Sequence, residues 1–390
     1  MAFSFPKLLK ILPKAVRTRA YKGSLTGQVI FVHLIRSIAK IHKMRKFTQK
    51  LTGLLVLVFF SFYISATAQM TPGDNQVIIN QLINEILTPR NVYIKTPSSF
   101  NTNNMYPIVF IFHGGGGSGE HFLQNNFLND LIDQEEFVAI YPNGHSDNQN
   151  ELGGYWNLGN EFTSADDVEF TDMIFEELAQ YNFIDFSKAY AIGLSNGAGM
   201  VNLLGKSTSH FIGIAPLFSQ QLLSIGNLNN SFKKLRVFQV CGENDNVIPI
   251  VGGNTPNGEF LSGFASAENW ANQLECDLLL SNQEIITIGN TTFNTNQYNY
   301  CLDPFSKVNS LLAINTGHNF NNPLTEQSIF QEIWHFFNDV SQLNINETNQ
   351  NEPKLIKMID ILGREEQEHK KGSFLFYIYD NGKIEKKFNP

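Results

Sequence analysis

The sequence predicts an α/β fold, with a doubly wound, mostly parallel sheet that is covered by helices on both faces. Short apolar runs alternate with longer amphipathic runs from about residue 75 to residue 342, the pattern of parallel strands joined by helices. Several short runs are apolar without alternation, as expected for strands that are buried on both faces. Of the 390 residues, 42% are hydrophobic and only 16% are charged, so the chain can bury a full core.

The predicted elements follow from the spacing of apolar residues. Strands are expected at residues 92–95, 108–112, 137–141, 189–193, 211–215, 237–241 and 308–314. Helices are expected where apolar residues recur every three or four positions. These segments are residues 121–134, 167–180, 197–206, 265–274 and 325–340.

The first part of the chain differs in composition from the rest and is expected to direct export. No Asp or Glu occurs before Asp74, and twelve of the 28 Lys and Arg residues lie within residues 1–50. Residues 51–64 form an uncharged apolar run of 14, followed by an Ala-Thr-Ala segment that ends at Ala68. This is the order of a signal peptide, so residues 1–68 are expected to be removed on export. A permanent membrane anchor is the alternative, but it needs roughly 20 apolar residues.

Met44 is the expected start of translation, which makes residues 1–43 an upstream extension of the reading frame. The remaining chain is acidic: without the twelve early basic residues, the 28 basic and 36 acidic residues leave 16 minus 36, or −20. This charge argues against nucleic acid as a partner, since phosphate binding requires clustered Lys and Arg. Contact with a membrane is expected only during export.

Export also bears on the three cysteines, because an oxidising compartment allows one pair to form. Cys241 ends an apolar run and is expected to be a buried core thiol. Cys276 and Cys301 flank an insertion rich in Asn and Thr. We expect these two to pair, with three free thiols as the alternative.

The clearest functional motif is Gly-Leu-Ser-Asn-Gly at residues 193–197. It follows an apolar strand and opens a helix, which is the context of a nucleophile elbow. Such a turn lifts the Ser195 hydroxyl off the sheet. It also directs the Asn196 amide and the helix N-terminus to the point where an oxyanion would form. A glycine-flanked serine that only caps the helix is the alternative.

A serine hydroxyl becomes a strong nucleophile when a histidine, oriented by a carboxylate, takes its proton. In this fold the acid and then the histidine follow the serine along the chain. His318 comes after strand 308–314 and a Thr-Gly pair, at the carboxyl end of the sheet. His210 precedes a strand at the wrong end, and His335 lies in an apolar helix. We therefore predict His318 as the base.

The acid is expected in the turn after strand 237–241. Asp245 lies past the glycine of this turn and before a Val-Ile-Pro segment that anchors the loop. This position points its carboxylate toward His318. Glu243 is the alternative acid.

A second oxyanion donor is expected from the glycine-rich segment at residues 113–119, which follows strand 108–112. Glycines let the main chain approach a substrate closely, so Gly114 or Gly115 is the expected donor. A phosphate-binding loop is the alternative, but the required Gly-Lys-Ser/Thr is missing.

One tryptophan and two aspartates lie between strand 137–141 and the body of the next helix. Trp156 either lines the substrate cleft or plugs the loop. Asp166 and Asp167 are explained by an N-cap and a first-turn charge, in preference to metal binding. No spacing of His and Cys suits zinc, so we predict no metal site and no cofactor.

These motifs together resemble the secreted α/β-hydrolase esterases grouped with polyhydroxybutyrate depolymerases and feruloyl or acetylxylan esterases. The matching pieces lie between residues 90 and about 335, in the order of the family, and include VYIKTP, VFIFHGGGG, FVAIYPNG, DFSKAYAIGLSNG, GENDNVIP and TGHNF. The resemblance implies the α/β-hydrolase fold at residues 69–342. It also implies Ser195 as nucleophile, Asp245 as acid, His318 as base and a disulfide between Cys276 and Cys301.

Two departures from this family limit the prediction of the substrate. Gly115 stands where the family often has a cysteine. Asn319-Phe320-Asn321 stands where it often has a Trp-Pro pair. The aromatic platform is therefore altered, and Phe320 joins Trp156 as a possible residue of the substrate cleft.

The C-terminal part is expected to form a separate small β unit. Residues 343–353 are polar and end in Pro353, as in a linker. Residues 354–390 hold 8 basic and 6 acidic residues, with alternation over 374–379 before an Asp-Asn-Gly turn. This tail resembles the C-terminal sorting domains of the type IX secretion system of Bacteroidetes.

The function expected from the sequence is that of a secreted serine esterase that forms an acyl-enzyme. Its expected substrate is an ester, with polyhydroxybutyrate and plant polysaccharide esters as the polymeric candidates. The tail would engage the secretion machinery and bring the protein through the periplasm to the cell surface or the medium. A serine peptidase and a non-catalytic binding module are the alternatives.

Overall fold

The computed structural model describes residues 70–148, 153–159, 163–229, 234–338, 355–360, 364–366, 373–379 and 384–389. The predicted signal peptide, its start at Met44 and the predicted linker at 343–353 lie outside these residues. Within the described ranges, no helix is both long and apolar enough to cross a membrane.

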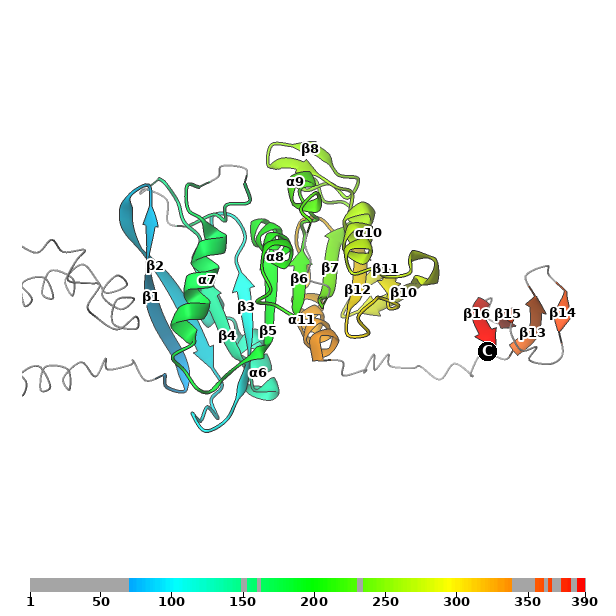
Figure 1. Cartoon of the computed structure of the whole chain (residues 1–390), viewed down its shortest axis with the longest axis horizontal. Coiled ribbons are helices and arrows are strands. Elements are labelled where there is room, and N and C mark those ends of the chain that lie inside the picture. Colours follow the sequence, from blue (N-terminus) through cyan, green and yellow to red (C-terminus); the bar gives the residue numbers. More distant parts are fainter. Residues whose placement is uncertain are drawn as a thin grey trace, which may run out of the picture. The chain divides into compact units, whose positions relative to one another are not determined.

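Strands and helices alternate along the chain from residue 106 to residue 242 (Figure 1). The strands of the main sheet are β1 (Gly73–Ile83), β2 (Ile86–Thr96), β3 (Tyr106–Phe112), β4 (Val138–Pro142), β5 (Ile184–Leu194), β6 (Gly213–Leu217), β7 (Arg236–Gly242), β10 (Asn282–Ile288), β11 (Thr291–Tyr298) and β12 (Lys307–Ala313). The helices are α5 (Glu120–Leu123), α6 (Asn126–Glu135), α7 (Asp167–Leu178), α8 (Asn196–Ser207), α9 (Leu223–Gly226), α10 (Gly263–Gln273) and α11 (Pro323–Asn338). A short hairpin, β8 (Gly253–Thr255) and β9 (Gly258–Phe260), and the 3₁₀ turn η1 (Leu278–Leu280) complete this part.

The ten strands form one sheet in the order β1-β2-β4-β3-β5-β6-β7-β12-β11-β10. Neighbours from β4 through β3, β5, β6 and β7 to β12 are parallel. The outer strands pair antiparallel on both sides. This is an α/β-hydrolase fold, and all seven predicted strands belong to it.

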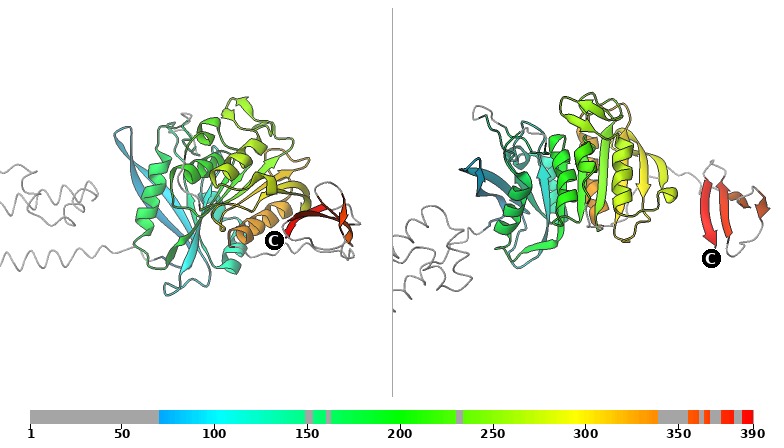
Figure 2. Two further views of the ribbon diagram at one scale, coloured as in Figure 1. Left: turned by 45° about the vertical axis from the view of Figure 1, so that its right-hand side comes forward. Right: turned by 45° about the horizontal axis from the view of Figure 1, so that its top comes forward.

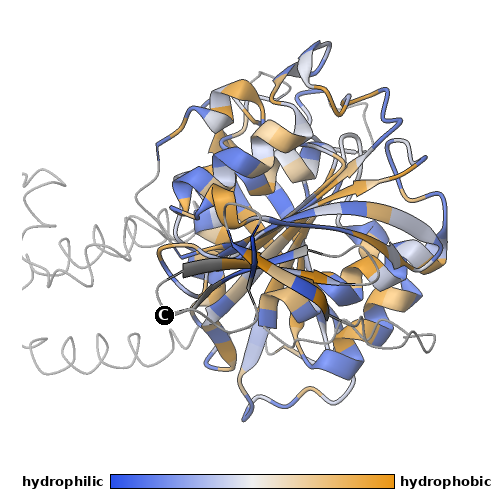
Figure 3. Cartoon of the chain, turned by 90° about the vertical axis from the view of Figure 1, so that its right-hand side faces the viewer, coloured by the Kyte–Doolittle hydropathy of each residue, from blue (hydrophilic) through white to orange (hydrophobic). Residues whose placement is uncertain are grey.

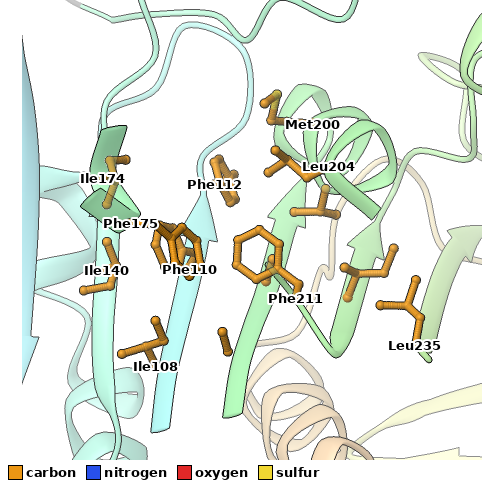
Figure 4. Close-up of a cluster of buried hydrophobic side chains, with 14 of the residues drawn as sticks. Ile108, Phe110, Phe112, Ile140, Ile174, Phe175, Met200, Leu204, Phe211 and Leu235 are labelled. Carbon is orange, nitrogen blue, oxygen red and sulfur yellow. The ribbon is translucent and has the colours of Figure 1, made fainter. Parts of the chain in front are cut away.

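Helices cover both faces of the sheet, as the two further views in Figure 2 show. One hydrophobic cluster joins the sheet to α7, α8 and α10, and a second cluster joins it to α6 and α11. Strand β3 contributes to both, because Phe110 faces the first cluster while Val109 and Ile111 face the second. Its continuous apolar sequence is therefore explained by burial on both faces. Figure 4 shows part of the first cluster, with Phe110 beside Phe175 of α7. Coloured by hydropathy, the central strands are mainly hydrophobic and the outer turns of the helices mainly hydrophilic (Figure 3).

The structure differs from the predicted elements at one helix and at the edge of the sheet, and the short elements α9, β8, β9 and η1 were not predicted either. The single helix expected at 121–134 is two helices in the structure. Asn125 has an extended backbone, which ends the first helix, and its side chain accepts from the Leu128 amide and so caps the start of α6. The edge strands β1, β10 and β11 were not predicted. They are half exposed and rich in Asn, Gln and Thr, so they lack the apolar runs that mark the central strands.

The disulfide between Cys276 and Cys301 is present, which confirms the predicted pair. Cys276 follows α10, and Cys301 lies between β11 and β12, so the bond closes the segment that holds the β10–β11 hairpin. Cys241 is a buried free thiol, as expected.

The C-terminal residues form a separate antiparallel sheet of four strands in the order β14-β13-β15-β16. The strands are β13 (Leu355–Asp360), β14 (Glu365–Glu366), β15 (Ser373–Tyr379) and β16 (Ile384–Asn389). This confirms the small β appendage. The predicted Asp-Asn-Gly turn lies outside the described residues.

Candidate active site

Ser195 occupies the sharp turn between β5 and α8. Its backbone has φ 54° and ψ −113°, and its side chain makes no capping hydrogen bond to α8, so the helix-cap alternative is wrong. The Ser195 amide donates to the Leu217 carbonyl at 2.9 Å. Both flanking glycines are required by close packing: a Cβ at Gly193 would lie 2.0 Å from the Gly197 oxygen, and one at Gly197 would lie 2.2 Å from a backbone oxygen of β3. The turn therefore presents the hydroxyl in a strained, well-defined position.

The structure brings Ser195, His318 and Asp245 together from three different loops at the carboxyl ends of β5, β12 and β7. His318 Nε2 lies 2.7 Å from Ser195 Oγ, and His318 Nδ1 lies 2.7 Å from Asp245 Oδ2. An ionised carboxylate can only accept, so Nδ1 carries the hydrogen and Nε2 is left as an acceptor. The arrangement therefore allows the Ser195 hydroxyl to donate its proton to His318.

The Asp245 carboxylate is held on both of its oxygens. Oδ1 accepts from the amides of Val247 and Ile248 at 2.8 and 2.9 Å, while Oδ2 faces His318. The side chain is only 2% exposed. These bonds fix the direction in which Oδ2 points, which is what an orienting group for a histidine requires.

Glu243, the alternative acid, has a different role in the structure. Its Oε2 accepts from the Asn315 amide at 2.8 Å. A second bond, from the Asn244 amide to the Thr316 carbonyl at 2.8 Å, joins the same two loops. Glu243 therefore helps to tie the loop of the acid to the loop that carries His318, without contacting the imidazole itself.

The glycine-rich segment packs directly against the Ser195 turn. A Cβ at Gly114 would lie 3.6 Å from Ser195 Cβ, and one at Gly115 would lie 3.6 Å from Asn196 Cβ. The ring of Tyr155 borders Gly115 on its other side, at 3.2 Å from the same Cβ position. Main-chain groups of this segment thus lie within reach of an atom bound to Ser195.

Two amides of the segment are free to bind such an atom. The Gly116 amide donates to Gly154 and the Gly117 amide donates to Gly114. Within the described residues, no hydrogen bond uses the amides of Gly114, Gly115 or Asn196. These are the three donors that the sequence predicted for an oxyanion.

The side chain of His113 connects this segment to the loop of Gly144. Its ring is buried, its Nε2 accepts from the Gly144 amide at 2.9 Å, and its Nδ1 lies 2.7 Å from the Gly114 carbonyl. Nδ1 must therefore carry the hydrogen, which makes the ring a neutral bridge between two loops. Burial lowers the pKa of His113 to about 4.

The lowered pKa of His113 predicts a loss of stability in acid. Below a pH of about 6.5 the unfolded chain takes up a proton at this histidine, whereas the folded chain does so only near pH 4. The contribution of His113 to the free energy of unfolding is therefore fully present above pH 6.5, and it decreases by about 3 kcal/mol as the pH drops to 4. The free energy of unfolding should fall less steeply over this window in His113→Asn. The exposed His121→Asn is the control, and equal slopes in all three proteins would contradict the assignment.

Trp156 fills the loop and does not line a cleft, which decides between the two roles that the sequence left open. It is fully buried, its indole N–H donates to the His113 carbonyl at 2.8 Å, and its amide donates to Asn196 Oδ1 at 2.7 Å. Its neighbour Tyr155 is half-buried and borders Gly115 instead. The sequence analysis missed Tyr155, although strand-like alternation would have placed it on the opposite side from a buried Trp156.

Phe320, the other predicted cleft residue, is half-buried beside the histidine loop. Its ring packs edge-on against Phe218 with centroids 4.6 Å apart, and Phe218 lies 6.3 Å from the His318 ring. Phe218 is buried and has a positive φ of 59°. An apolar pair therefore flanks the imidazole.

A buried ion pair underlies the loop of Trp156 and was also missed. Arg90 Nη1 lies 2.7 Å from Asp167 Oδ1, and Asp167 Oδ2 accepts from the Asn157 amide at 2.6 Å. The guanidinium lies 3.6 Å from the Phe170 ring centroid. Asp166 is the N-cap of α7, as predicted. Asp167 is more than a first-turn charge, since it joins β2, α7 and this loop.

The remaining candidates lie elsewhere. His210 Nε2 is 2.6 Å from Asp172, and its ring stacks on Phe175. His335 belongs to α11. The described part of the chain contains no group of three or more His, Cys, Asp or Glu side chains placed to hold a metal ion.

Comparison with known proteins finds similarity to esterases. No protein-family model matches the chain. It is 28% identical over 167 residues to feruloyl esterase B of Piromyces equi, covering 42% of this chain and 31% of that protein. It is 22% identical over 272 residues to the bifunctional acetylxylan esterase/xylanase XynS20E of Neocallimastix patriciarum, covering 69% of this chain and 35% of that protein. The chain thus spans about a third of the length of either relative.

Among solved structures, the acetyl xylan esterase from Aspergillus awamori aligns with a TM-score of 0.48 and 16% identity. The alignment covers 68% of this chain and 99% of that one.

Proposed function

We propose that the chain is a carboxylic ester hydrolase that acts on plant polysaccharide esters through Ser195, His318 and Asp245. The observation that carries this proposal is the continuous chain of two 2.7 Å contacts from Ser195 Oγ through the imidazole to a fixed carboxylate. The sequence similarity to feruloyl and acetylxylan esterases supports the same reaction class.

In the first half of the reaction, Ser195 Oγ attacks the ester carbonyl carbon while its proton passes to His318 Nε2. The imidazolium is stabilised by Asp245 Oδ2, which the two loop amides hold in place. The carbonyl oxygen becomes an oxyanion and accepts from the amides of Asn196 and of Gly114 or Gly115. Collapse of the tetrahedral intermediate releases the alcohol, which takes its proton from His318.

In the second half, water attacks the acyl group on Ser195. His318 removes the proton from this water, and the same amides hold the new oxyanion. Release of the acid returns the proton to Ser195 Oγ. Every proton therefore moves between Ser195, His318, water and substrate.

The preferred acyl group and alcohol can be identified by measuring the hydrolysis of a panel of esters by the purified mature chain, residues 69–390. We expect turnover of methyl ferulate or of acetylated xylan, with a peptide amide hydrolysed far more slowly. Preference for a polyhydroxybutyrate film would move the substrate to polyesters on the same triad. Hydrolysis of none of these esters, with folding intact, would contradict the proposed function.

We also propose that the chain is exported, with removal of residues 1–68 and with the C-terminal sheet acting as a sorting signal. The motif order of residues 44–68 and the distinct charge of residues 354–390 support this. In the part of the chain that the structure describes, the C-terminal strands pair only with one another, which agrees with a tail that folds as its own unit.

Deletion of residues 346–390 is expected to trap active protein in the periplasm with little change in the thermal stability of the rest. The secreted wild-type protein should begin at Gln69, which N-terminal sequencing would reveal. Normal release of the truncated chain, or its failure to fold, would count against the sorting role. Retention of the first 68 residues would restore the membrane-anchor alternative.

A further inference from the structure

The hairpin of β10 and β11 extends the sheet past α10, and no helix of the described residues covers its face on the α10 side. Figure 1 shows α10 beside β12, with β10 and β11 beyond it. On the opposite face of the hairpin, Ile288 and Phe293 pack in the cluster that includes α11. On the α10 side, the strands carry a different set of residues.

The pairing register places these residues in two rows. Gln283, Asn296 and Ser310 are cross-strand neighbours in one row. Ile285, Asn294 and Leu312 form the next row. In the first row, Asn296 Nδ2 already donates to the Tyr298 hydroxyl and Ser310 Oγ accepts from Gln239 Nε2, so the exposed Gln283 supplies the amide group at the surface. The second row combines the exposed Asn294 amide with aliphatic groups.

These rows form the floor of a groove of about 600 Å³. Phe264, at the start of α10, and Val251, in the loop after Asp245, form its walls. The three apolar groups at its surface are well exposed: Phe264 is 55%, Ile285 75% and Val251 78% accessible. An exposed apolar surface that lies beside hydrogen-bonding groups in a concavity marks a binding site.

The charge of the groove narrows the class of ligand. Glu284 is the single charged residue among those that line it. An anionic polymer would find no cation here and would face an acidic body, and a cationic ligand would find one carboxylate at most. A neutral ligand with many hydroxyl groups fits best, because amide side chains both donate and accept, and the C–H faces of a sugar ring pack on an aromatic or aliphatic surface.

We propose that this groove binds a neutral stretch of polysaccharide backbone, so that the chain has a carbohydrate-binding site separate from Ser195. The proposal rests on the proposed function, since it takes the ligand to be the polymer that carries the ester. Within β7 and β12, the groove residues Cys241 and Leu312 precede Asp245 and His318 by four and six positions. The groove and the catalytic loops are thus built on the same two strands.

The test measures binding without hydrolysis, with soluble ester-free xylan as the probe in affinity electrophoresis. The double variant Phe264→Ala, Asn294→Ala should bind this xylan at least tenfold more weakly than the wild type. Its kcat/KM toward 4-nitrophenyl acetate should stay within twofold, because neither residue contacts the triad. Phe264→Tyr should retain binding, since it keeps the ring.

A matched control is Leu279→Ala, whose side chain is 90% exposed on η1 outside the groove. It should leave xylan binding unchanged. Equal binding of xylan by the wild type and the double variant, or no binding by either, would overturn the groove proposal. If both proteins still hydrolyse 4-nitrophenyl acetate, the esterase proposal is unaffected by that result. Self-association that the double variant abolishes would assign the groove to a second copy of the chain instead. If the chain hydrolyses no ester at all, that result would contradict the proposed function independently of the groove.

Discussion

Replacing Ser195 with alanine is expected to lower kcat for ester hydrolysis by about 10⁶, the size of loss found when the nucleophile of a comparable triad is removed. The substitution deletes one oxygen and leaves the Ser195 amide bonded to Leu217, so the fold should be unchanged. His318→Ala should lose nearly as much, because the hydroxyl then has no base. Rates with a soluble ester, together with labelling by a fluorophosphonate, would measure both variants.

A suitable control for this variant is Ser219→Ala. Ser219 is a buried serine whose hydroxyl donates to the Gln220 carbonyl at 3.2 Å, away from His318. It should keep wild-type activity and covalent labelling. Retention of more than about a tenth of the activity by Ser195→Ala would contradict its role as nucleophile, since triad serines carry far larger effects.

Replacing Asp245 with asparagine is expected to lower kcat by about 10⁴, less than the loss of Ser195. The amides of Val247 and Ile248 require an acceptor at the position of Oδ1. The asparagine oxygen will therefore take that position, and its NH₂ group will face His318. This group donates to Nδ1 and forces the hydrogen onto Nε2, which can then no longer accept from Ser195.

The matched control is Glu243→Gln, which tests the alternative acid directly. Its amide oxygen can still accept from the Asn315 amide, so the two loops should stay joined and the rate should change by no more than a few-fold. Comparable losses in the two variants would contradict the assignment of Asp245. Unfolding transitions of both variants should be measured beside the rates.

The central strands and the Ser195 turn could be predicted from sequence because their signals are local. A strand buried on both faces must be apolar at every position, as in β3, and this pattern is visible without any knowledge of its neighbours. The turn likewise needs Gly193 and Gly197 next to the serine, since any side chain there would clash with adjacent backbone. His318 followed from the chain order of the fold and from its place after a strand.

Other features depended on contacts between residues far apart in the chain. Arg90 pairs with Asp167 across 77 positions, and Trp156 is buried by the loops of His113 and Asn196. Asp245 and Glu243 are close in sequence and chemically alike. The sequence favoured Asp245 by its place in the turn but left Glu243 open, and the structure separates the two by the groups that each carboxylate contacts.

The edge hairpin of β10 and β11 shows the same limit. Its polar residues resemble a loop in sequence, yet they become strands because β12 provides a pairing partner and α11 buries Phe293. Sequence by itself therefore determined the parallel core and the Ser195 turn, whose requirements are satisfied by nearby residues. Tertiary structure decided between Asp245 and Glu243 as the carboxylate beside His318, and it alone showed which aromatic residue borders the site and where a second groove opens, because these depend on the partners that distant segments supply on folding.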